Sequence, residues 1–224
     1  MNTHSVIVSA KRTPIGSFLG QLSSFSASDL GSFVIKKILE ELKIPLNQID
    51  EVILGNVLSS GQGQAPARQA TIKGGCPNSV ESLTINKMCG SGLKAVMLAD
   101  QAIRCGDADF ILAGGMESMS NAPHLLYNIR SGKKLGHGEI VDSMIHDGLW
   151  DAYSNKHMGS CAEMLVAKKG YTREDQDNYA IESYKRAKKA IDSGIFHKEV
   201  IPIEIKQYNN DLVSISVDEE PYKV

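Results

Sequence analysis

The first part of the chain alternates between apolar segments of strand-like and helix-like period. Residues 5–9 form a β-branched run, and residues 51–58 form a second apolar run that Gly55 interrupts. Between these runs, residues 28–42 carry apolar side chains at helical spacing, with Asp29 in the first turn. This pattern predicts a strand, a helix and a second strand.

The alternation continues as far as residue 115. Residues 66–73 are predicted to form a helix with a proline near its start, and residues 82–85 a strand. Residues 93–103 have apolar side chains on one helical face, and residues 110–113 are predicted to be a fully buried strand that ends at two glycines. A β-α-β-α order is typical of an α/β fold with a mostly parallel, helix-covered sheet.

The pattern changes after residue 119. Residues 120–156 are rich in Gly, Ser, Asn and His and show no sustained period, and a stretch that long is usually functional or an inserted domain. Two predicted helices follow, at residues 158–169 before Gly170 and at residues 172–193. Residues 200–205 are predicted to form a final strand.

Composition excludes several classes of function. The chain has 224 residues, 42% of them hydrophobic, and a net charge of −2 without a lysine or arginine block. There is thus no electrostatic case for binding nucleic acid or an anionic membrane, and no apolar run approaches the length of a membrane span. The first residues do not resemble a signal peptide.

The cysteine and histidine patterns favour a reducing compartment without a metal site. The four cysteines (Cys76, Cys89, Cys105 and Cys161) form no CxxC pair and are too sparse for a disulfide scaffold. The six histidines contain neither HExxH nor zinc-finger spacing.

The segment 86–92, Asn-Lys-Met-Cys-Gly-Ser-Gly, carries the strongest chemical signal. It places Cys89 between a predicted strand and the N-terminus of a predicted helix, where the helix dipole favours an anion. The thiolate is the nucleophilic form of cysteine. Gly90 and Gly92 permit a sharp turn and close approach of a substrate. Spacing alone is equally compatible with a nucleophile and with a buried structural cysteine.

Five motifs, in order, resemble those of the thiolase family, the acetyl-CoA acetyltransferases. They are Arg-Thr-Pro-Ile-Gly at 12–16, Gly-Gln-Gly-Gln-Ala-Pro-Ala-Arg-Gln-Ala at 61–70, Cys-Gly-Ser-Gly-Leu-Lys-Ala at 89–95, Ala-Gly-Gly-Met-Glu-Ser-Met-Ser at 113–120 and His-Met-Gly at 157–159. The match runs through nearly the whole chain. It favours the nucleophile interpretation of Cys89 over the structural one.

The resemblance implies thioester chemistry on coenzyme A, with acyl-CoA as substrate and no tightly bound cofactor. In thiolases the cysteine at position 89 attacks an acyl-CoA and becomes acylated. The carbanion of a second acetyl-CoA then attacks the acyl-enzyme and forms a 3-ketoacyl-CoA, and the degradative direction reverses these steps.

The resemblance also implies residues of the CoA site. Leu149 matches an apolar position beside the pantetheine arm, and His157 and Met158 match the substrate-lining segment. Tyr184 resembles the mitochondrial acetoacetyl-CoA thiolase subgroup, in which this tyrosine contacts CoA and helps to hold a potassium ion. The alternatives are a satisfied loop or cap histidine at position 157 and an ordinary aromatic side chain of an amphipathic helix at position 184.

The family's fold implies a domain division and an assembly. Residues 1–119 correspond to the N-terminal α/β domain without its last strand, and residues 120–224 to an incomplete loop domain that shapes the CoA site. The resemblance implies a five-stranded sheet of order 3-2-1-4-5, whose fifth strand is expected beyond residue 224. The strand around Ile111, the fourth, is therefore expected at an unpaired edge. A homodimer or homotetramer is expected, in the cytoplasm or, after processing, in the mitochondrial matrix.

The chain departs from the family in its length, because thiolases are nearly twice as long. The Gly-His-Pro, Cys-x-Gly-Gly and Asn-Glu-Ala-Phe motifs are absent: His137 lies in Gly-His-Gly, and neither Cys105 nor Cys161 precedes Gly-Gly. We therefore expect a nucleophile without its acid–base partners, which belong to the absent C-terminal half of a complete enzyme, and little turnover. The alternative is a catalytically inactive CoA-binding or assembly fragment.

Two other enzyme classes fit the sequence less well. A decarboxylating ketoacyl synthase shares the fold and the cysteine, but the motifs at 113–120 and 157–159 favour a thiolase. A dinucleotide-binding oxidoreductase would need Gly-x-Gly-x-x-Gly after the first strand, and the chain has none there.

Overall fold

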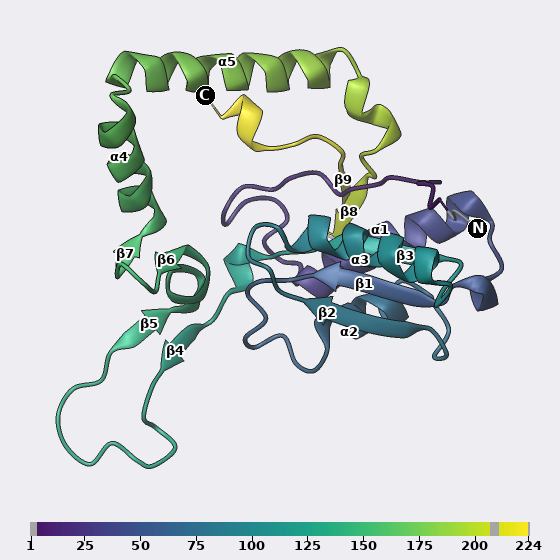
Figure 1. Cartoon of the computed structure of the whole chain (residues 1–224), viewed down its shortest axis with the longest axis horizontal. Coiled ribbons are helices and arrows are strands. Elements are labelled where there is room, and N and C mark those ends of the chain that lie inside the picture. The colour runs from purple at the N-terminus through teal and green to yellow at the C-terminus, as the bar shows by residue number, and fades with distance from the viewer. Residues whose placement is uncertain (1–3, 207–210, 224) are drawn as a thin grey trace.

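The computed structural model describes residues 4–206 and 211–223 (Figure 1). Its first part contains, in order, α1 (Ala27–Leu42), β1 (Glu51–Gly55), α2 (Pro66–Lys73), β2 (Glu81–Ile85), α3 (Ser91–Cys105) and β3 (Ile111–Gly115). Its second part contains β4 (His124–Leu126), β5 (Ile140–Asp142), a π-helix (Met144–Leu149), β6 (Trp150–Asp151), β7 (Lys156–His157), α4 (Met158–Lys169), α5 (Arg173–Asp192), β8 (Ile203–Lys206) and β9 (Leu212–Ile215).

The central element is a three-stranded parallel sheet of order β2-β1-β3. Leu54 of β1 lies opposite Thr84 of β2 on one side and Gly114 of β3 on the other. Within the described residues, β3 pairs on one side only, so the expectation of an open edge at this strand is confirmed. The parallel sheet and its helices confirm the α/β fold class.

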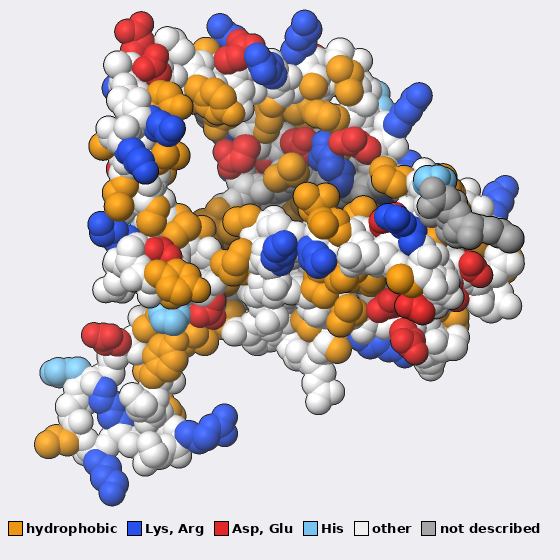
Figure 2. Space-filling view, in the orientation of Figure 1, with side chains coloured by type: hydrophobic (Ala, Val, Ile, Leu, Met, Phe, Trp, Pro, Cys, Tyr) orange, Lys and Arg blue, Asp and Glu red, His pale blue; other side chains and the backbone are white. Residues whose placement is uncertain are grey.

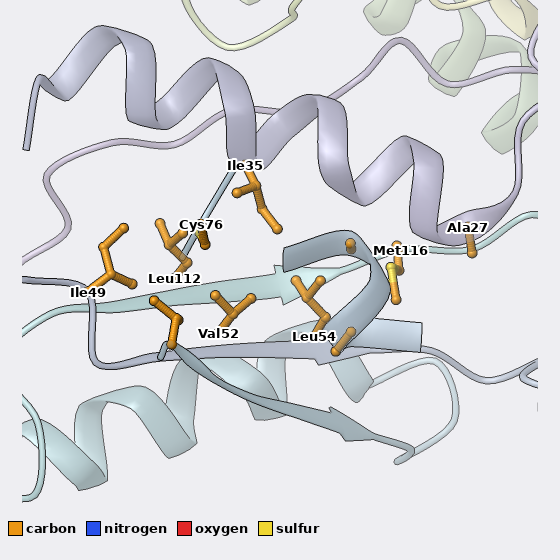
Figure 3. Packing of buried hydrophobic residues seen from close by; sticks show 11 residues of the cluster. Ala27, Ile35, Ile49, Val52, Leu54, Cys76, Leu112 and Met116 are labelled. Atoms are coloured by element: carbon orange, nitrogen blue, oxygen red, sulfur yellow. The ribbon is translucent and has the colours of Figure 1, made fainter. Parts of the chain in front are cut away.

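Helices cover both faces of this sheet. Val52 and Leu54 of β1 lie in one buried cluster with residues of α1 and α2, and Figure 3 shows Leu54 and Met116 facing α1. Ile53, between them in β1, is only 2% exposed and points to the opposite face, because successive strand side chains alternate. That face is covered by α3, which contacts both β1 and β3.

The helix ends follow the local signals in the sequence. Ser26 and Asp29 form a capping box at the start of α1, and Pro66 occupies the first position of α2. Thr172 starts α5 with a second capping box, and Gly170 ends α4 with a φ of 72°. The four helices predicted at these places are confirmed within one or two residues.

The predicted strand at residues 5–9 is wrong. The described residues there form no strand, and the side chains of Val6, Ile7 and Val8 are 76%, 80% and 57% exposed. A β-branched run becomes a strand only where a neighbouring strand supplies its hydrogen bonds, and this segment has none beside it in the described chain. The sheet order 3-2-1-4-5 is also wrong, since β1 pairs directly with β3 and leaves no place for residues 5–9 between them.

Two further strand predictions need correction. The strand after α3 starts at Ile111 and is not fully buried, because it lies at the sheet edge and only Leu112 among its five residues is buried. The strand predicted at residues 200–205 corresponds to β8, which is shifted toward the C-terminus. It pairs antiparallel with β9, which the apolar pattern did not predict.

After the short strands β4 to β7, the second half of the chain contains two parts that differ in how they contact the sheet domain. A long arch of α4 and α5 extends away from the sheet, and charged side chains gather along the outer side of α5 (Figures 1 and 2). In contrast, β8 and β9 pack against α1 through a second buried cluster that includes Leu22, Ile203 and Ile215. The domain division at residue 119 stays a prediction.

No described helix has the length and apolar character needed to span a membrane.

Arg12 connects the start of the chain to its end. Its guanidinium donates two hydrogen bonds to Asp218, at 2.6 and 3.0 Å, and one to Glu199 at 2.6 Å. Burial acts to raise the pKa of Asp218, but the hydrogen bonds from Arg12 and from the backbone N–H of Ile15 outweigh it, and the pKa lies below its usual value of 3.8. The Arg-Thr-Pro-Ile-Gly motif at 12–16 therefore has a structural role, because its arginine connects the two ends of the chain.

The Asp218→Asn variant should be less stable than the wild type by about 1.5–3 kcal/mol at neutral pH, because a nearly buried charge-assisted bond is lost. Because the pKa of Asp218 is lowered in the folded state, its carboxylate stabilises the fold at any pH above the usual carboxyl pKa. This contribution is lost as the pH falls through the folded-state pKa. In urea unfolding, the gap between wild type and variant should therefore close below pH 3.8. Glu199→Gln, at a more exposed bond to the same arginine, should cost less than about 1 kcal/mol. A pH-independent gap would contradict this assignment.

Candidate active site

A cavity with a volume of about 430 Å³ lies at the carboxyl edge of the parallel sheet. Its lining comes from four segments, at residues 55–58, 88–92, 115–119 and 144–149. The first and third segments begin at the last residues of β1 and β3, and the second begins three residues after the end of β2. In open α/β sheets, ligands bind at this edge.

The turn that carries Cys89 is held by side-chain hydrogen bonds. Met88, just before the cysteine, has a φ of 49°, a left-handed conformation that costs a residue with a side chain roughly 1–2 kcal/mol. Its backbone N–H donates to Oδ1 of Asn86 at 2.9 Å. The hydroxyl of Ser91, which is 4% exposed, accepts from the N–H of Lys87 at 2.8 Å and donates to the carbonyl of Met88 at 2.6 Å.

Glycines allow α3 to approach the sheet edge. A Cβ on Gly55, the last residue of β1, would lie 2.5 Å from Cβ of Ser91 and 2.8 Å from the N of Gly92. A Cβ on Gly115, the last residue of β3, would lie 3.3 Å from Cα of Gly92. The first turn of α3 therefore rests on the ends of two strands, and Cys89 lies just before this turn, exposed, on the cavity wall.

A carboxylate forms part of the same cavity. Glu117 accepts three hydrogen bonds, from Nδ2 of Asn56 at 2.7 Å and from the backbone N–H groups of Val57 at 2.8 Å and Leu58 at 3.2 Å. Burial raises the pKa of Glu117, although these three donors act in the opposite direction. The carboxylate thus fixes the loop that continues from β1.

The structure brings together Cys89 and Leu149, which both line the cavity, whereas His157 and Met158 lie outside its lining. His157 is the N-cap residue of α4, and its Nδ1 accepts from the N–H of Gly159 at 3.0 Å. Its ring packs edge-to-face on Trp150 with centroids 6.5 Å apart. This geometry is that of a cap histidine, and a substrate role for His157 stays a prediction.

Tyr184 also lies away from the cavity, half-buried on α5. Among the described residues, no group of three or more His, Cys, Asp or Glu side chains could hold a metal ion. The described residues therefore include no such group of three side chains at Tyr184, and its contacts with CoA and potassium remain predictions.

The family model for the thiolase N-terminal domain matches residues 5–224. The chain belongs to the thiolase family. It is 52% identical over 216 residues to a probable acetyl-CoA acetyltransferase of Escherichia coli K12, a match that covers 96% of this chain and 55% of that protein. It is 54% identical over 215 residues to an acetyl-CoA acetyltransferase of Yarrowia lipolytica, with 96% and 53% covered. The chain spans about half the length of the curated relatives it matches.

The sequence analysis did not select two polar residues that line this cavity, Asn56 and Glu117. Each follows the carboxyl end of a strand, Asn56 after β1 and Glu117 two residues after β3. Neighbouring parallel strands end at the same edge of a sheet. A polar residue just after each of two predicted strands is therefore a signal from which both residues could have been selected.

Iodoacetamide should alkylate Cys89 several-fold faster than Cys105. Both thiols are exposed, but they lie at opposite ends of α3. The helix dipole favours negative charge at the N-terminus, beside Cys89, and opposes it at the C-terminus, at Cys105, by about 0.3–1 kcal/mol at each end. Cys76 should react last, because it is buried and burial raises the pKa of its thiol. Peptide mass spectrometry over a time course measures all three rates. Equal rates at Cys89 and Cys105 would show that the helix end has no effect.

Gly55→Ala should destabilise the chain by about 1–3 kcal/mol and slow the alkylation of Cys89, because the new methyl group collides with the first turn of α3. Gly114→Ala is the matched control in β3, since its Cβ would meet nothing closer than Cδ2 of Leu54 at 3.9 Å. Urea unfolding and alkylation are measured for both variants. The close-packing account fails if the two substitutions have the same effect.

Proposed function

We propose that the chain carries the acyl-accepting half of an acetyl-CoA acetyltransferase, with Cys89 as the nucleophile. The thiolate would attack the carbonyl carbon of an acyl-CoA, the acyl–CoA thioester bond would break, and CoA would leave as its thiolate and take up a proton. The product is an acyl thioester on Sγ of Cys89. The single observation that supports this most is the exposed thiol of Cys89 at the start of α3, on the wall of a cavity.

The cavity suits a short acyl group and the slender pantetheine arm. Its lining is mainly apolar and includes four methionines (Met88, Met116, Met119 and Met144), whose flexible thioethers adapt to ligands of varied shape. Leu149, on the π-helix, would contact the arm. His157, Met158 and Tyr184 would belong to the outer part of the CoA site, and potassium, if used, would bind near Tyr184.

The condensation step needs proton transfers that this cavity does not supply. Among its described lining residues there is no histidine, and Glu117 is engaged by three N–H donors. General acid–base groups typically contribute 10²- to 10⁴-fold. We therefore propose that these groups belong to the part of the relatives beyond this match, and that the 224-residue chain is acylated without turning over. The proposal includes 3-ketoacyl-CoA as product and a homodimer or homotetramer as the complete assembly.

Incubating the purified chain with acetyl-CoA should add one acetyl group, located on Cys89 by peptide mass spectrometry. Cys89→Ser should remove this labelling, and Cys105→Ser should not. Acetoacetyl-CoA formation should be at least about 10²-fold below that of a full-length relative, since acid–base groups are lacking.

Two results would contradict the proposal. Robust turnover by the isolated chain would show that the chemistry needs no further acid–base residues. Binding of CoA without acetylation of Cys89 would instead favour the alternative, a catalytically inactive CoA-binding fragment.

A further inference from the structure

A chain of hydrogen bonds connects Glu117 to the residue before Cys89. The carboxylate accepts from the N–H of Val57 at 2.8 Å, and the carbonyl of Val57 accepts from Nδ2 of Asn86 at 3.4 Å. Oδ1 of Asn86 then accepts from the N–H of Met88 at 2.9 Å. Three segments far apart in the sequence, at the ends of β3, β1 and β2, are linked in this way.

The last residue of this chain of bonds is the strained one. Met88 has a left-handed φ of 49°, which residues with side chains rarely adopt and which must be held by surrounding interactions. Its N–H is fixed by Asn86 and its carbonyl by Ser91. Because Cys89 follows directly, the backbone angles of Met88 set the direction in which the thiol points.

We propose that Glu117 is a positioning residue for Cys89, which acts through Val57 and Asn86 to hold Met88 in its left-handed conformation. This inference rests on the proposed nucleophilic role of Cys89. Glu117 donates no proton to the substrate and touches no reacting atom in this account. Its function is to hold the end of the β1 loop as the support for Asn86.

The sign of the effect separates positioning from simple electrostatics. A carboxylate on the same cavity as a thiol disfavours the thiolate by like-charge repulsion, so removal of the charge alone would speed up reactions of Cys89. If Glu117 positions the thiol, its removal slows them instead. Glu117→Gln preserves size but presents an N–H₂ group to backbone N–H donors, and so disrupts the carboxylate's bonds.

Asn86→Asp breaks one link of the chain of bonds and preserves the other, but its new negative charge also disfavours the Cys89 thiolate. The Met88→Gly background described below separates the two effects, because charge repulsion would persist there whereas a positioning effect would not. Asn86→Asp retains an oxygen for the N–H of Met88 and loses the N–H₂ donor to the carbonyl of Val57. Asn86 is exposed, so this variant should fold as the wild type does. Glu51→Gln is the matched control, because Glu51 lies at the opposite end of β1 and burial also raises its pKa.

The experiment measures the rate of Cys89 acetylation at saturating acetyl-CoA in the full chain, with thermal unfolding in parallel. Glu117→Gln and Asn86→Asp should each slow acetylation about tenfold, and the double variant should be no slower than the slower single variant, because both act through one path. Glu51→Gln should react at the wild-type rate. In a Met88→Gly background, where glycine adopts a positive φ freely, Asn86→Asp should have little effect.

Several outcomes would overturn the inference. They are wild-type rates in both variants, a faster reaction in Glu117→Gln, additive losses in the double variant, or an undiminished effect of Asn86→Asp in the glycine background. The same variants are compared with iodoacetamide, which needs no CoA site. Absence of acetylation in the wild type would overturn the proposed function, whereas equal alkylation rates in wild type and variants would overturn the role of Glu117.

Discussion

The contact between the first turn of α3 and the carboxyl ends of β1 and β3 is the constraint on which the site depends. Gly55, Gly92 and Gly115 contribute no side chains to this contact, so the helix N-terminus lies against the sheet edge. A single methyl group at Gly55 would come within 2.5 Å of Ser91. Since protein interiors tolerate little overpacking, this contact fixes the place of Cys89 relative to the cavity.

The polar groups of the site follow from the same arrangement. When parallel strands end at one edge, the loops that leave them must satisfy their backbone N–H groups locally. Glu117 does so for the loop after β1, and Ser91 and Asn86 do so for the turn before α3. The carboxylate and the strained turn therefore form one hydrogen-bonded unit around the proposed nucleophile.

Helix positions could be predicted from the sequence more accurately than the pairing of strands. The ends of α1, α2 and α5 were predictable because Ser26, Pro66 and Thr172 act within their own helical turns. The strand at residues 5–9 and the sheet order were not, since pairing depends on partners distant in the chain.

The same limit applies to the site. Cys89 was predicted from its own segment and from the resemblance. Leu149 lines the same cavity, and its contact with the pantetheine arm stays a prediction. Glu117 lies in the motif at 113–120 and just after a strand, but its role was not predicted, because that role arises from donors about sixty residues earlier in the chain. His157 shows the opposite case, in which a residue selected by resemblance has a clear local structural role as a helix cap.

The most direct test is a crystal structure of the chain after exposure to acetyl-CoA. The account predicts density for an acetyl group on Sγ of Cys89, inside the cavity between the first turn of α3 and Leu149, with Met88 still in the left-handed conformation. An unmodified Cys89, or an acetylated one turned away from this cavity, would contradict it.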